Sequence, residues 1–156
     1  MKKIIVAFVV FLALCACGNG EKKALDYHGL SMSIPFRTFC DSLAARGFAV
    51  DSAKSDSDWN RVSMVNPSLN YRLMLAQRND TLLAVQENYT ISTNDSTRKM
   101  WQQIHDDLEK SLGAWPNMLK EGQDHRVAKF EADGGFITVT LENTYKPTLS
   151  VLYQMK

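Results

Sequence analysis

The chain has few cysteines and no excess of charge of either sign. It contains three cysteines in 156 residues, and 18 Lys and Arg residues against 17 Asp and Glu residues give a formal net charge of +1. A near-neutral chain without a basic stripe lacks the electrostatic footprint of a nucleic-acid-binding protein, so we expect no nucleic-acid partner. The apolar run at residues 4–14 would reach only about 16 Å as a helix, whereas a bilayer core is about 30 Å thick.

Sequence motifs that position catalytic groups, phosphates or metal ions are also missing. The chain has no Gly-x-Ser-x-Gly elbow, no glycine-rich phosphate loop and no pair of histidines one helical turn apart. The histidines are His28, His105 and His125, and we expect His105 on a solvated helix face. The sequence therefore predicts no catalytic residue, no cofactor and no metal, and we expect the protein not to be an enzyme.

The first residues have the layout of an export signal. A Lys-Lys start precedes the apolar run, and the small residue Ala16 stands directly before Cys17. Residues 14–17 (Leu-Cys-Ala-Cys) resemble the lipobox of bacterial lipoprotein signal peptides. That resemblance implies cleavage before Cys17 and lipidation of its thiol, with acyl chains such as palmitate holding the protein to a membrane. The alternative is an ordinary signal peptide with incidental cysteines.

The predicted cleavage sets the expected organisation of the chain. Residues 1–16 would be the signal peptide, residues 17–24 a lipidated flexible tether, and residues 25–156 a single α+β domain. Removal of the first sixteen residues, which include Lys2 and Lys3, would change the formal charge from +1 to −1. Two or more acyl chains hold a protein firmly to a bilayer. In the resemblance to bacterial lipoproteins, Gly18 permits outer-membrane sorting. We expect a lipid-anchored protein of the cell envelope (periplasm or outer membrane), with the outer membrane favoured and the leaflet left open.

Hydrophobic periodicity predicts two amphipathic helices among antiparallel strands. One helix would begin at Ser33–Pro35 and end at Gly47, and the other would be capped by Asn94 or Ser96 and end at Gly113. Their apolar stripes are Phe36, Phe39, Cys40 and Leu43 in the first, and Trp101, Ile104, Leu108 and Leu112 in the second.

Period-two alternation predicts the strands. They lie at 25–33, then at 49–53, 59–65, 71–77 and 83–89 between the helices, and finally at 127–132, 136–142 and 148–153, with hairpin turns at 78–81 and 133–135. The expected fold class is α+β, with two helices packed on antiparallel meanders in the order β-α-β4-α-β3.

The packing residues carry a second resemblance. Ile34-Pro35, Phe39, Leu43 and Gly47-Phe48, followed by Trp101, Leu108, Leu112, Gly113 and Pro116, resemble small uncharacterised lipoproteins of Bacteroidetes. The two halves, each a helix followed by a meander, are similar to the β-lactamase-inhibitor-protein-like architecture. None of these resemblances carries catalytic residues, so no site transfers from them.

Several side chains are candidates for binding or modification. Trp59 and Trp115 flank loops and are candidates for a binding surface, with a place in the core as the alternative, and Tyr71 and Tyr89 are weaker candidates. We expect Trp101 in the core. Cys40 is the remaining thiol of the domain, so no internal disulfide forms; we expect a small residue on a buried helix face, with a reactive thiol as the alternative. Ser52, Thr81 and Ser96 lie in tripeptides that resemble O-glycosylation acceptors of exported Bacteroidetes proteins.

Three functions remain open at this point. The first is a non-enzymatic binding or scaffold domain with an envelope protein as partner. The second is an inhibitor or immunity-type module, and the third is a hydrolase with an unrecognised site. A polar pocket that gathers His105 or His125 with a carboxylate would favour the hydrolase. A flat or concave sheet face with exposed Trp and Tyr would favour the other two.

Overall fold

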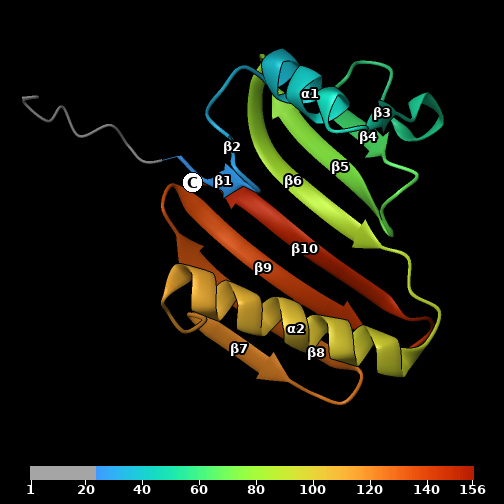
Figure 1. The fold of residues 1–156 in the computed structure, drawn as a ribbon, viewed down its shortest axis with the longest axis vertical. Coiled ribbons are helices and arrows are strands. Elements are labelled where there is room, and N and C mark those ends of the chain that lie inside the picture. Colours follow the sequence, from blue (N-terminus) through green and yellow to red (C-terminus); the bar gives the residue numbers. More distant parts are fainter. Residues whose placement is uncertain (1–23) are drawn as a thin grey trace, which may run out of the picture.

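A computed structural model describes residues 24–156 as a large antiparallel sheet with two α-helices (Figure 1). The predicted signal peptide, the lipidation site Cys17 and the predicted tether up to residue 23 lie outside the described residues. The α+β class with two helices and antiparallel strands is confirmed. Neither helix is long and apolar enough to cross a membrane.

The elements follow one another along the chain in pairs and meanders. They are β1 Asp26–Tyr27, β2 Leu30–Ser31, α1 Phe36–Ala45, β3 Ala49–Val50, the short 3₁₀ helix η1 Ser52–Lys54, β4 Arg61–Val65, β5 Tyr71–Arg78, β6 Thr81–Tyr89, α2 Asn94–Leu112, β7 Met118–Glu121, β8 His125–Ala132, β9 Gly135–Glu142 and β10 Thr148–Met155. The large sheet has the strand order β3-β4-β5-β6-β10-β9-β8-β7.

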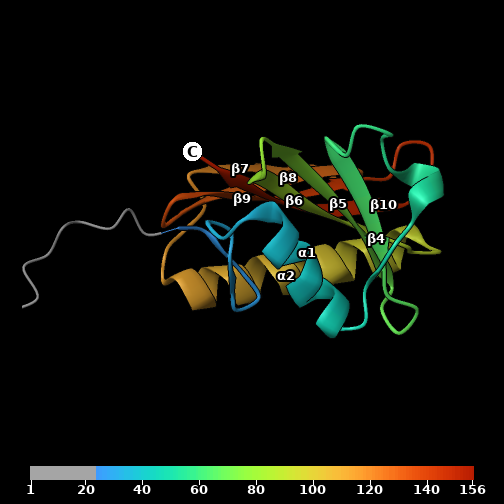
Figure 2. The same cartoon turned by 90° about the horizontal axis from the view of Figure 1, so that it is seen from above.

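The two halves of the large sheet repeat one plan. Each half is a helix followed by a four-stranded meander, and the last strands of the halves, β6 and β10, pair antiparallel at the centre. Both helices lie on the same side of the sheet (Figure 2). We call the opposite side the open face, because neither helix covers it. Gln86, Leu152 and Thr138 lie side by side on this face and are half-buried.

The predicted first helix forms, but another segment supplies its cap. Phe36, Phe39 and Leu43 are buried, as the periodicity indicates. The side chain of Ser33 caps nothing; instead the Asp80 carbonyl accepts from the Phe36 N–H (2.9 Å) and the Asp80 carboxylate accepts from the Arg37 N–H (3.2 Å). A carboxylate satisfies helix N-terminal N–H groups from any position in the chain that geometry brings near.

The hairpin turn between β5 and β6 and the C-terminal end of α1 were predicted correctly. Asn79 and Asp80 have φ of 51° and 59°, which is the type I′ hairpin geometry expected for these residues. At the end of α1, Phe48 N–H donates to the Leu43 carbonyl (3.1 Å) and Gly47 has a φ of 89°. This is a Schellman motif, in which Phe48 packs back over the helix end.

The second helix ends at Gly113 as predicted, but two other expectations about it were wrong. Thr93, and not Asn94 or Ser96, is the N-cap, and its hydroxyl accepts from the Ser96 N–H (3.2 Å). His105 is not solvated: only 6% of its surface is exposed. Position 105 lies one turn after Trp101, which is fully buried, so both residues belong to the inward stripe.

The strand predictions were wrong in two places, so the order is two strands, helix, four strands, helix, four strands. Residues 25–33 form the β1–β2 hairpin rather than one strand, because His28 and Gly29 adopt positive φ values of 47° and 81°. Strand β7 was missed because all four of its residues are exposed, which leaves no alternation to detect. In β6 a bulge at Leu83 interrupts the alternation, so that Leu82 is in the core and Leu83 is exposed.

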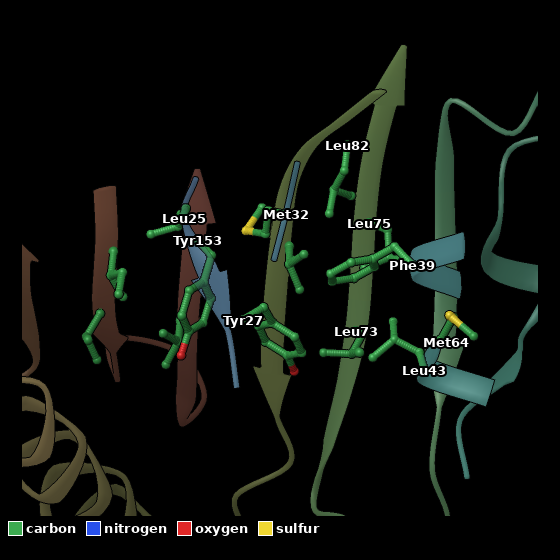
Figure 3. Packing of buried hydrophobic residues seen from close by; sticks show 14 of the residues in the cluster. Leu25, Tyr27, Met32, Phe39, Leu43, Met64, Leu73, Leu75, Leu82 and Tyr153 are labelled. Atoms are coloured by element: carbon green, nitrogen blue, oxygen red, sulfur yellow. The ribbon is translucent and has the colours of Figure 1, made fainter. Parts of the chain in front are cut away.

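The core lies between the sheet and the two helices. Figure 3 shows that the β1–β2 hairpin contributes to it, with Tyr27 beside Tyr153 of the central strand β10. Ring centroids of these two tyrosines are 5.1 Å apart in an edge-to-face arrangement. Ile137, Val139 and Leu141 of β9 are buried on its helix-facing side.

Candidate functional site

A hollow of about 760 Å³ lies between α1, the loop before β4 and the β5–β6 hairpin. We call it the Trp59 groove. Its lining residues are Phe36, Arg37, Cys40, Asp41, Asp58, Trp59, Gln77 and Asp80. The volume falls within the range of about 300–1,000 Å³ that is typical of ligand sites. The sequence-predicted candidates Trp59 and Cys40 thus meet in one place.

Trp59 is held in the groove by an unusual backbone conformation. Its φ is 59°, in the left-handed region that bulky residues rarely adopt. Its N–H donates to the Asp56 carbonyl (3.1 Å) and its carbonyl accepts from Gln77 Nε2 (3.0 Å). With these bonds in place the indole remains 53% exposed. Strained residues that surrounding structure holds in place cluster at functional sites.

The rim of the groove is acidic. The lining residues carry one guanidinium, that of Arg37, and three carboxylates, those of Asp41, Asp58 and Asp80. Asp80 caps α1 and Asp58 accepts from the Asn60 N–H (3.2 Å). Asp41 is exposed and makes no hydrogen bond or ion pair with another residue between 24 and 156. Its charge is therefore free to act on a bound group.

Cys40 is half-buried at the groove and packs against the core. Burial raises the pKa of its thiol to about 11, and the charges of Asp41 and Asp80 contribute to the increase. The thiolate is the reactive form of cysteine. Cys40 is therefore protonated near neutral pH, which favours the interpretation as a small packing residue over the reactive thiol.

A second cluster, centred on Glu87, was not predicted. Glu87 is 1% exposed on the helix-facing side of β6. Its carboxylate accepts from the Tyr27 hydroxyl (3.0 Å) and the Tyr89 hydroxyl (2.8 Å), and Nε2 of His28 lies 2.9 Å away. Burial, and next the charge of Glu87, raise the pKa values of Tyr27 and Tyr89. The sequence did hold a signal, because Val85, Glu87 and Tyr89 share one face of a strand.

The Glu87 cluster predicts a pH-dependent stability. The hydrogen bond to Glu87 raises the pKa of His28, although burial opposes the shift; Asp26 raises it further and Arg46 lowers it. A raised pKa in the folded state means that protonated His28 stabilises the fold below its unfolded pKa of about 6.5. This contribution is lost as pH rises through the raised pKa, and for a half-exposed histidine it is at most about 1 kcal/mol.

The measurement is the free energy of unfolding in urea from mildly acidic to mildly alkaline pH. In His28→Gln, the free energy of unfolding should fall less as the pH rises from mildly acidic to mildly alkaline. His125→Gln serves as the control. An NMR titration should show a lower His28 pKa in Glu87→Gln. An unchanged His28 pKa in that variant would mean that the carboxylate does not stabilise the imidazolium.

The other two histidines also lie near carboxylates. His105 Nδ1 is 3.0 Å from an Asp106 oxygen and 4.0 Å from a Glu109 oxygen, and the three side chains offer ligand atoms that all lie within 4.8 Å of one another. The Asp106 carboxylate accepts a hydrogen bond from His105 Nδ1, so this nitrogen carries a proton and has no lone pair for a metal. The other ring nitrogen, Nε2, is buried without a partner. Because Nδ1, the ligand atom of His105 in this cluster, is already engaged with Asp106, we assign no metal to the cluster.

His125 and Glu142 form a pair on the open face. The His125 Nδ1 atom is 2.9 Å from Glu142, and both side chains are about 40% exposed. Hydrogen bonds from Thr144, followed by the bond with His125, lower the pKa of Glu142 to about 2. The pair stands at the surface rather than in the polar pocket that would favour a hydrolase.

The remaining candidates are dispersed. Trp115 is 76% exposed in the loop after α2, where it lines a smaller hollow with Asp106 and Glu109. The rings of Tyr71 and Tyr89 contact each other on the helix-facing side in a tilted arrangement, with centroids 5.1 Å apart. Among the strands within residues 24–156, the open face carries no exposed Trp or Tyr, the feature that would have favoured binding through the sheet.

The proposed glycosylation acceptors Ser52, Thr81 and Ser96 are exposed in η1, at the start of β6 and in the first turn of α2. Exposure is compatible with modification and does not test it. Comparisons with models of protein families, with curated proteins and with solved structures found no match to this chain.

Proposed function

We propose that this chain is a lipid-anchored protein of the bacterial cell envelope and that its domain binds a partner without catalysis. The binding site in this proposal is the Trp59 groove. The observation that carries it is an exposed tryptophan fixed at positive φ beside a hollow large enough for a ligand. Tryptophan is enriched among residues that dominate binding energy at interfaces.

The anchor rests on the lipobox resemblance and has its own test. We expect Cys17→Ala to release the protein from the membrane fraction, since lipid on that thiol is the proposed attachment. Mass spectrometry of the native product should find the acyl-modified cysteine at the N-terminus. Membrane partitioning that persists in Cys17→Ala would contradict the lipid anchor, and Cys40→Ser is the matched control that should remain membrane-bound.

The binding site is tested by photo-crosslinking in cells. Benzoylphenylalanine would replace Arg37, an exposed lining residue of the groove, Leu152 on the open face and Tyr145, which is 97% exposed in the β9–β10 loop, as the control. We expect a discrete adduct from position 37, where Trp59 itself is retained, and none from position 145. Adducts of equal yield from both positions would indicate non-specific contact and would refute the groove as the site.

An inhibitor or immunity-type module is the second candidate. It is favoured by the position of both helices on one side, which leaves eight strands available on the open face (Figure 2). The aromatic residue that this face offers a partner is the half-buried Phe136, whereas the exposed Trp59 and Trp115 lie on loops. An adduct from position 152 without one from position 37 would replace the first proposal by this one.

A further inference from the structure

We propose that the Trp59 groove takes a basic segment of a partner polypeptide, with an Arg or Lys side chain against the indole and an apolar neighbour on Phe36 and Cys40. This inference rests on the proposed function, because it names the ligand of the same site. The components are an exposed aromatic ring, an apolar floor and an acidic rim, contributed by three elements that are distant in sequence.

Charge is the first reason to expect a cation. The lining carries three carboxylates against one guanidinium, a formal charge of −2. Asp41 has no partner among residues 24–156 that would neutralise it. The acidic side chains act electrostatically on the apolar part of the groove, since the charges of Asp41 and Asp80 both raise the pKa of the Cys40 thiol. Potentials at binding surfaces are complementary to those of their partners.

The aromatic wall is the second reason. A guanidinium or ammonium group is attracted to the face of an aromatic ring, and tryptophan is the best such ring. The same domain already contains this contact, because the Arg126 guanidinium lies 5.4 Å from the Trp101 ring centroid. Trp101 is buried, whereas Trp59 is 53% exposed.

A polypeptide fits the groove better than a free polyamine. Phe36 is buried, Cys40 is half-buried and both line the hollow, so a ligand gains by bringing an apolar group beside its cation. An Arg or Lys next to an aliphatic residue supplies both groups. Arginine and tryptophan are also the residues that recur together at protein interfaces.

Cys40 provides a built-in probe of the groove charge. The full-length chain, purified from membranes, would be treated with cationic and anionic methanethiosulfonates, and labelling of the Cys40 peptide would be followed by mass spectrometry. Relative to 2-mercaptoethanol, we expect about a tenfold preference for the cationic reagent. Asp41→Asn should reduce this preference about threefold, and Asp107→Asn, an exposed carboxylate on α2, should not change it. Equal reactivity with both reagents would refute the acidic groove.

Peptide protection of Cys40 tests the ligand class. The capped peptide Ala-Leu-Arg-Leu-Ala should slow labelling about fivefold at saturation, and its citrulline analogue should bind about tenfold more weakly. Asp41→Asn and Trp59→Asn should weaken binding about fivefold or more; asparagine is chosen because it tolerates the positive φ at this position. Far-ultraviolet circular dichroism would verify that both variants are folded.

Three outcomes would overturn the inference: no protection by the arginine peptide, equal protection by the citrulline peptide, or equal protection by spermidine at the same charge concentration. These failures are distinguishable from failure of the proposed function. A discrete photo-adduct at position 37 without peptide protection would keep the binding site and refute its basic ligand. Absence of the adduct would refute the binding site itself.

Discussion

Replacing Glu87 by alanine is expected to lower the free energy of unfolding by about 3–5 kcal/mol, which is the range for removing one partner of a buried charged cluster. The carboxylate is 1% exposed and accepts from two tyrosine hydroxyls. Without it, Tyr27 and Tyr89 keep buried donors that have lost their acceptor, and each such donor costs about 1–3 kcal/mol. Glu87→Gln retains the shape and one acceptor oxygen, so we expect an intermediate loss.

The control is the other glutamate–histidine pair. Glu142 lies 2.9 Å from His125, as Glu87 does from His28, but its side chain is 43% exposed. Glu142→Ala should therefore cost much less stability than Glu87→Ala, because solvent screens the exposed pair. Urea denaturation followed by circular dichroism measures both values. Equal losses for the two alanine variants would show that burial does not set the importance of these pairs.

The Glu87 cluster also has a consequence for how the domain meets the predicted anchor. Tyr27 and His28 belong to the β1–β2 hairpin, which immediately follows the predicted tether. Leu25, Tyr27 and Met32 of this segment are buried in the core. If Cys17 carries lipid, any force from the membrane reaches the sheet through these packed residues and the Glu87 hydrogen bonds, rather than through a loose end.

The sequence predicted the elements whose signal is local. The stripe Phe36, Phe39 and Leu43 is set by helical spacing, and the turn at Asn79 and Asp80 by the tolerance of these residues for positive φ. Strand β7 could not be predicted in this way, because a strand exposed on both faces at the edge of a sheet has no period-two pattern. His105 was misplaced because its polarity was given more weight than its position one turn after Trp101.

The candidate site could be predicted only in part. Trp59 stood out as an aromatic residue beside a loop, but its partners Asp41 and Asp80 come from α1 and from a hairpin. No spacing rule links residues that are brought together by tertiary packing. The same limit applies to Asp80 as the cap of α1, since capping rules consider the residues adjacent in sequence to the helix start.

The second large effect is expected at Trp101. This side chain is fully buried, its indole N–H points at the Val139 carbonyl 3.4 Å away, and its ring stacks on His105 with centroids 5.2 Å apart. Trp101→Ala should lower the free energy of unfolding by about 3–5 kcal/mol, because it removes the largest apolar contact of α2 and leaves a cavity. Trp101→Phe should lose less, because the smaller ring fills part of that cavity.

Trp115 provides the matched control, since the same substitution is made at a tryptophan that is 76% exposed. Trp115→Ala should change the free energy of unfolding by no more than about 0.5 kcal/mol. Urea denaturation of both variants tests the pair, and the slope of each transition shows whether the denatured state has changed. A small loss in Trp101→Ala would mean that α2 repacks over the vacated space, and the assignment of Trp101 as the anchor of this helix would then be wrong. A large loss in Trp115→Ala would mean that the exposed indole has a packing role, which would weaken the case for treating exposed tryptophans of this domain, Trp59 included, as binding residues.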